Sequence, residues 1–95
     1  MKLRSILANN HKKEFLVTSS AGREYSFPYA RTEPKPSLRA PVSDVYVDHE
    51  LGREAFTYIL RSGDQGTVHF EQVLEYNEDP EYLADLLAYQ LSLEA

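Results

Sequence analysis

The sequence predicts an α+β fold, in which an antiparallel meander of about six short strands is followed by one C-terminal helix. Residues 2–73 form short runs of β-type composition separated by turn residues, and these turns are too short for parallel crossovers. Residues 80–95 instead repeat apolar side chains at helical spacing. A helix that covers one face of an antiparallel sheet gives an α+β architecture. At 95 residues, the chain is expected to form a single domain, 1–95.

The first half predicts three strands, at residues 2–8, 14–18 and 24–29. Alternation along the second strand places Phe15 and Val17 on one face, and alternation along the third places Tyr25, Phe27 and Tyr29 on one face. Pro28 cannot donate a hydrogen bond to a neighbouring strand. The third strand is therefore expected to lie at a sheet edge or to end near this proline.

The second half predicts strands at 42–48, 54–61 and 67–73, after a proline-rich crossover or loop at 30–41. Residues 62–66 contain two glycines and give the strongest hairpin signal in the chain. At least one of these glycines is expected to have a positive φ angle. The strand before them should place Phe56, Tyr58 and Leu60 on one face.

The C-terminal helix carries two apolar stripes. Asp79 can cap its N-terminus and Pro80 suits its first turn. One stripe, centred on Leu83, Leu87 and Leu91, is expected to rest on the sheet. The second stripe then needs another surface, which predicts a homodimer or a partner protein bound through this helix; its residues are Tyr82, Leu86, Tyr89 and Leu93. The alternative is a sheet that curls around the helix and covers both stripes.

Composition excludes several classes of protein. The chain is 42% hydrophobic with eleven Tyr and Phe residues, which argues against disorder. It has no cysteine, so disulfides, thiolate catalysis and cysteine-bound zinc are excluded, and a reducing cytoplasm is the expected compartment. No apolar run resembles a signal peptide or approaches the ~20 residues of a membrane span.

Charge is distributed unevenly along the chain. Residues 1–41 carry a formal charge of +5 and residues 42–95 carry −10. The two halves are expected to fold against each other and partly compensate. A net-negative domain binds phosphate backbones poorly, so nucleic-acid binding by this domain alone is not expected. The alternative is a weak single-stranded nucleic-acid binder that uses the interleaved basic and aromatic residues 23–39.

The sequence contains no motif that assigns a catalytic, cofactor-binding or metal-binding residue. Residues 48–50 (Asp-His-Glu) lie consecutively in a predicted turn, which splays their side chains apart. His69 and Glu71 share one face of the predicted last strand, and the alternative function is a small-ligand-binding domain or small enzyme that uses this face. Ser62, Asp64 and His69 lack any sign of an oxyanion site. We therefore expect a protein that is not an enzyme and needs no cofactor.

Several strings together resemble a family of small, uncharacterised bacterial proteins. They are Phe27-Pro28-Tyr29-Ala30-Arg31, residues 47–58, Gly66-Thr67-Val68-His69 and residues 73–80. In that family the equivalent segment precedes a helix-turn-helix domain of the lambda-repressor class. The resemblance implies a role in transcriptional regulation, for example beside a toxin–antitoxin operon. The 95 residues end before any such helix pair, so the second stripe is expected to dock that domain or another chain.

Overall fold

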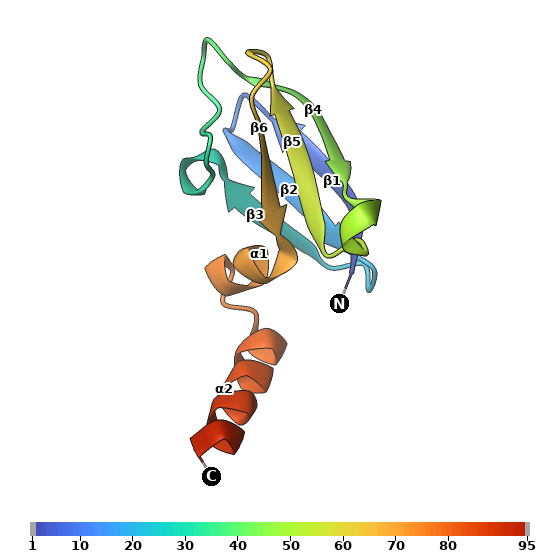
Figure 1. Cartoon of the computed structure of the whole chain (residues 1–95), viewed down its shortest axis with the longest axis vertical. Coiled ribbons are helices and arrows are strands. Elements are labelled where there is room, and N and C mark those ends of the chain that lie inside the picture. Colours follow the sequence, from blue (N-terminus) through green and yellow to red (C-terminus); the bar gives the residue numbers. More distant parts are fainter. Residues whose placement is uncertain (1, 95) are drawn as a thin grey trace.

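The computed structural model describes the backbone of residues 2–94 and the side chains of residues 2–92. Within these residues, six antiparallel strands form two three-stranded sheets, and two helices follow them (Figure 1). The first sheet is ordered β1 (Leu3–Asn9), β2 (Glu14–Ser19) and β3 (Glu24–Pro28), and the second β4 (Val42–Val47), β5 (Ala55–Leu60) and β6 (Gln65–His69). The helices are α1 (Phe70–Tyr76) and α2 (Pro80–Glu94). Short 3-10 helices lie at Tyr29–Arg31 and His49–Leu51. The predicted α+β class is confirmed.

The first sheet follows the predicted alternation. Phe15 and Val17 on β2 are buried, while the residues that alternate with them along the strand are only partly buried. Tyr25 and Phe27 on β3 are also buried on the core face, and Tyr29 follows them into the core. The edge strand β3 ends at Pro28, as the missing amide hydrogen predicts.

The second sheet contains the predicted hairpin between β5 and β6. Gly63 has a φ angle of 96°, which a residue with a side chain rarely adopts. Phe56, Tyr58 and Leu60 are buried on the expected face of β5. The last strand is shorter than predicted, because the chain enters α1 at Phe70 instead of continuing as a strand to residue 73.

The core lies between the inner faces of the two sheets. The ring of Phe15 lies 4.8 Å from that of Tyr29, 4.9 Å from Phe56 and 5.3 Å from Tyr58, measured between centroids. Strand β1 contacts β4 across the two sheets. Near the end of β1, the Asn10 side-chain amide donates to the Val42 carbonyl at 3.0 Å and accepts from the Val42 amide at 3.1 Å. The Asn10 side chain thus makes the two hydrogen bonds to Val42 that a paired backbone residue would make, and it joins the end of β1 to the start of β4.

Residues 32–41 connect the two sheets without regular secondary structure. This segment is attached to the second sheet, because the Tyr58 hydroxyl donates to the Pro34 carbonyl at 2.7 Å. Gly66 on β6 lies so near that a Cβ atom there would be 2.9 Å from the Glu33 carbonyl oxygen and would also collide with the Tyr58 hydroxyl group. Glycine is therefore required at this position by the close approach of the crossover.

Helix α2 projects away from the sheets (Figure 1). The molecule measures 50 × 23 × 22 Å, and its radius of gyration is 14.4 Å, above the roughly 13 Å of a compact chain this long. The expectation that one stripe of this helix rests on a sheet is wrong. Helix α1 occupies the ends of β3 and β6 instead, and it contacts the beginning of α2.

Candidate interaction surface

Helix α1 replaces the predicted end of the last strand. Phe70, Val73 and Leu74 follow helical spacing and are all buried, so a helix buries them against the first sheet where a strand would separate them. The Gln72 side chain accepts a hydrogen bond from the His69 amide at 2.9 Å and caps the first turn. His69 is therefore the last residue of β6 and Glu71 lies in α1, which overturns the prediction that they share a strand face.

The turn after α1 sets the direction of α2. The Asp79 amide donates to the Leu74 carbonyl at 3.0 Å and the Glu78 amide donates to the Glu75 carbonyl at 3.1 Å, which together make a Schellman turn. Glu78 takes the left-handed position of this turn, with a φ angle of 52°. The Asn77 side chain ties the turn to the first sheet by donating to the Ser26 carbonyl at 2.9 Å.

Asp79 anchors the first turn of α2. One carboxylate oxygen accepts from the Tyr82 amide at 3.0 Å, as predicted for the N-cap, and the other accepts from the Tyr25 hydroxyl at 2.8 Å. Asp79 is only 4% exposed, and Arg23 lies 3.7 Å from it. The Tyr82 amide above all, and then the Tyr25 hydroxyl, lower the pKa of this carboxyl group. Asp79 therefore stays ionised and holds α2 against β3.

Beyond its first turn, α2 leaves both apolar stripes exposed. Leu86 is 38% exposed and Tyr89 is 63% exposed, while Tyr82 is half-buried and packs against the core. The fourth residue predicted for this interface, Leu93, has a side chain outside the described residues. The opposite stripe is exposed as well: Leu83 at 40%, Leu87 at 58% and Leu91 at 58%. The alternative in which the sheet covers both stripes is therefore also wrong.

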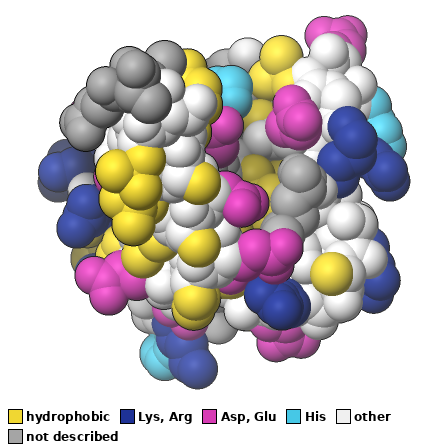
Figure 2. Space-filling view, turned by 90° about the horizontal axis from the view of Figure 1, so that it is seen from below, with side chains coloured by type: hydrophobic (Ala, Val, Ile, Leu, Met, Phe, Trp, Pro, Cys, Tyr) yellow, Lys and Arg dark blue, Asp and Glu magenta, His cyan; other side chains and the backbone are white. Residues whose placement is uncertain are grey.

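Figure 2 shows the molecule from below the view of Figure 1, the side on which α2 lies. Apolar side chains gather on this side, with Asp and Glu side chains beside them. We use the name α2 surface for the exposed apolar side chains of this helix, which are Leu83, Leu86, Leu87, Tyr89 and Leu91. Exposed side chains of this kind in contiguous positions mark contact sites on soluble proteins. The α2 surface is therefore the strongest candidate interaction site in the described part of the chain.

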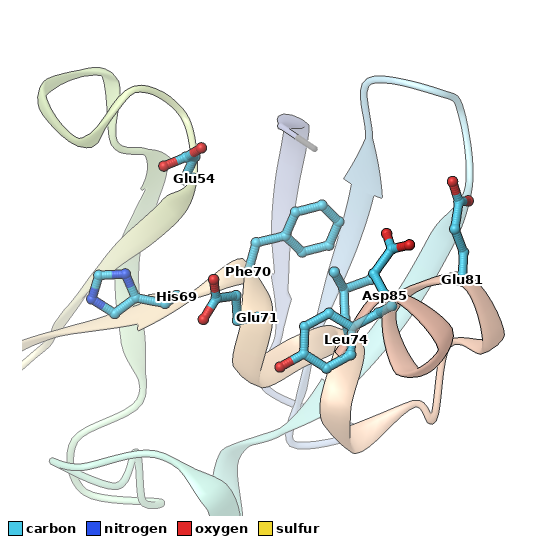
Figure 3. Close-up of a pocket in the computed structure, with 8 residues that line it drawn as sticks. Glu54, His69, Phe70, Glu71, Leu74, Glu81 and Asp85 are labelled. Atoms are coloured by element: carbon cyan, nitrogen blue, oxygen red, sulfur yellow. The ribbon is translucent and has the colours of Figure 1, made fainter. Parts of the chain in front are cut away.

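A pocket of about 390 Å³ opens in the angle between α1 and α2. Phe70, Leu74 and Tyr82 supply its apolar lining. Carboxylates and one imidazole complete it, and they belong to Glu54, His69, Glu71, Glu81 and Asp85. In Figure 3, His69 and Glu71 lie on one side, Glu81 and Asp85 on the other, and Phe70 between them. We call this cavity the acidic pocket.

The acidic pocket brings together residues that the sequence interpretation did not connect. It contains His69 and Glu71, although these residues meet there through the start of α1 and not through a strand face. Glu54 comes from the loop before β5, and Asp85 comes from α2. The spacing of Phe70, Val73 and Leu74 fits a helical turn, but three apolar positions in so short a segment do not distinguish a helix from a strand.

In the described part of the chain, few oppositely charged side chains form ion pairs. Within the described residues, the ion pairs are those of Arg23 with Asp79 at 3.7 Å and with Glu81 at 3.8 Å. The expected compensation between the basic first half and the acidic second half is therefore limited to this arginine. Of the carboxylates in the acidic pocket, Glu54, Glu71 and Asp85 form no ion pair with the described residues.

The remaining candidate sites receive less support from the geometry. Among the side chains of residues 2–92, no group of three or more His, Asp or Glu is arranged to hold a metal ion. In segment 23–39, Tyr25, Phe27 and Tyr29 are buried and cannot stack on bases, while Arg31 lies 5.4 Å from the ring centre of Tyr76. The aromatic platform on which the nucleic-acid alternative depended is thus absent from this segment's surface.

No protein-family model, curated protein or solved structure matches this chain. Across residues 2–94, none of the helices has the length and apolar character needed to cross a membrane.

Proposed function

We propose that this chain is a non-enzymatic interaction domain of a bacterial regulatory protein, and that α2 is the element through which it contacts a second copy of itself or another protein. The exposure of both stripes of α2 is the observation that supports this role most directly. Of the apolar side chains of this 15-residue helix, Tyr82 in the first turn packs against the core, while Leu83, Leu86, Leu87, Tyr89 and Leu91 are exposed.

The free energy available at this surface can be estimated from its side chains. Complete burial of one large aliphatic side chain contributes roughly 1.5–3 kcal/mol. Leu86 and Leu91 are 38% and 58% exposed, so covering each such side chain adds about 1 kcal/mol. The five side chains of the α2 surface together offer roughly 5 kcal/mol per protomer, which is comparable with the cost of association itself. Self-association through this surface alone is therefore expected to be weak.

The regulatory role comes from the resemblance to bacterial proteins in which an equivalent segment precedes a DNA-binding helix pair. In such an arrangement the sheets and α1 would hold α2 at a defined angle, so that α2 links the domain to its neighbour. A cytoplasmic location is part of this proposal, and the absence of cysteine from the sequence is consistent with it.

Sedimentation equilibrium of the full chain tests the contact element. The wild-type protein should exceed its monomer mass of 10.9 kDa as the concentration approaches about 200 µM. Leu86→Glu should return it to the monomer mass without loss of circular dichroism, because the side chain is exposed. Leu87→Glu should also keep the fold, because Leu87 is 58% exposed.

Leu38→Glu is the matched control, because Leu38 is 88% exposed and lies in the crossover, away from α2. It introduces the same change of charge and should leave the association unchanged. A wild-type protein that stays monomeric at every concentration would contradict self-association, and equal behaviour of the Leu38 and Leu86 variants would contradict α2 as the contact element.

A further inference from the structure

The acidic pocket and the α2 surface form one continuous site. Tyr82, Leu86 and Tyr89 lie three or four residues apart and share one face of α2. Asp85 lies beside that face and lines the pocket, as Tyr82 does. A segment that lies along Leu86 and Tyr89 would therefore reach the pocket mouth within one further turn of α2.

The charged residues of α1, α2 and the turn between them are all acidic. Residues 70–94 include seven Asp and Glu and no Lys or Arg. In the described residues, Arg23 is the cation paired with this group, and it contacts Asp79 and Glu81 at one edge. Helix α2 also has no basic residue in its last turn to offset the negative end of its dipole. A symmetric contact between two copies of α2 would therefore bring like charges together.

The pocket has the chemistry that a lysine or arginine side chain requires. Tyr82, beside the small exposed edges of the buried Phe70 and Leu74, offers an apolar wall for a methylene stem, and Glu71 and Asp85 offer carboxylates for its charged end. A volume of about 390 Å³ lies within the range of natural ligand pockets and accommodates one long side chain with its water.

Building on the proposed function, we infer that the occupant of this site is a basic amphipathic helix of a partner protein. Its apolar side chains cover Leu86 and Tyr89 of the α2 surface, and one of its lysine or arginine side chains enters the acidic pocket. Apolar burial alone gives weak association, so the charge pairs in the pocket add the affinity and select a basic partner over a second copy.

The test measures binding of a fluorescent synthetic probe to the full chain by anisotropy. The probe is an amphipathic helical peptide of leucine, alanine and lysine, and the matched peptide replaces every lysine with glutamine. The lysine peptide should bind about tenfold more tightly than the glutamine peptide. Its affinity should fall as salt rises from about 50 to about 300 mM, because exposed charge pairs are screened.

Two double variants of the protein test whether the lysine peptide binds at the acidic pocket. The double variant Glu71→Gln with Asp85→Asn should remove most of the preference for lysine, and both residues are exposed, so the fold should persist. The double variant Glu75→Gln with Glu78→Gln removes the same charge from residues that do not line the acidic pocket, and it should keep the preference.

Equal binding of the two peptides, or equal loss in both double variants, would overturn the inference, because attraction would then reflect net charge alone. Concentration-dependent dimers that Leu86→Glu disrupts but the lysine peptide does not displace would identify a second copy as the occupant and would also overturn it, while leaving the proposed function intact. If Leu86→Glu changes neither self-association nor peptide binding, the proposed function fails together with the inference.

Discussion

Replacing Asp79 with alanine tests whether a single buried carboxylate sets the position of α2. The substitution removes the N-cap of α2 and leaves the Tyr25 hydroxyl without its acceptor at 2.8 Å. Loss of an N-cap costs about 1 kcal/mol, and an unsatisfied buried hydroxyl costs roughly 1–3 kcal/mol. The free energy of unfolding should therefore fall by about 2–4 kcal/mol, a large share of what so small a domain has.

Urea denaturation followed by circular dichroism measures this difference. Asp85→Ala is the control, because Asp85 lies on the same helix but is exposed, and its effect should stay within about 0.5 kcal/mol. A Tyr25→Phe variant should cost about 1 kcal/mol, and combining it with Asp79→Ala should add little more, because both remove the same contact. Similar losses in the Asp79 and Asp85 variants would refute the anchoring role of Asp79.

The stability of the wild-type protein should also depend on the ionisation of Asp79. Its pKa is lowered in the folded state, chiefly by the Tyr82 amide and then by the Tyr25 hydroxyl. The stabilisation is therefore complete above the unfolded-state pKa of about 3.9 and is lost as the pH falls through the lower folded-state pKa. Asp79→Asn, which keeps a capping side chain, should show a smaller loss of stability in this acid range. Equal pH dependence of the two proteins would contradict the assignment.

Three further predictions follow from the backbone. Glu78→Gly should raise the free energy of unfolding by about 0.5–1 kcal/mol, because Glu78 has a φ angle of 52°, whereas Glu75→Gly within α1 should lower it by about 1 kcal/mol. Gly66→Ala should lower it by about 1–3 kcal/mol through collision with the Tyr58 hydroxyl, as urea denaturation would measure. Limited trypsin digestion, followed by mass spectrometry, should cut first after Arg39, which is exposed in the crossover; initial cleavage in β5 would contradict this order.

The sequence by itself determined the first five strands, the hairpin before the sixth strand and the start of the last helix. Phe15 and Val17, like Phe56 and Tyr58, lie two residues apart on a strand, so both members of each pair point to the same, buried face. Asp79 followed by Pro80 is a local capping signal whose hydrogen bond to Tyr82 spans only three residues. Features that depend only on residues close together in the sequence could therefore be predicted without a structure.

Helix α1, which packs against β3 and β6, could not be predicted in the same way. Residues 70–76 form only two turns, and a segment this short does not show a clear period of either a strand or a helix. The packing of Phe70 against Tyr25, with ring centroids 5.8 Å apart, favours the helix over a strand. This contact joins residues that are distant in the sequence. The acidic pocket depended on that decision and could not be predicted.

The surroundings of α2 were decided by the tertiary structure alone. Two apolar stripes on one helix indicate that two surfaces are needed, but they do not say whether the chain itself supplies them. The left-handed turn at Glu78 and the contact of Asp79 with Tyr25, 54 residues away, direct α2 away from the sheets. Leu86 and Leu87 on its two stripes are exposed for that reason, because the direction of a helix is set by its junction and not by its own periodicity.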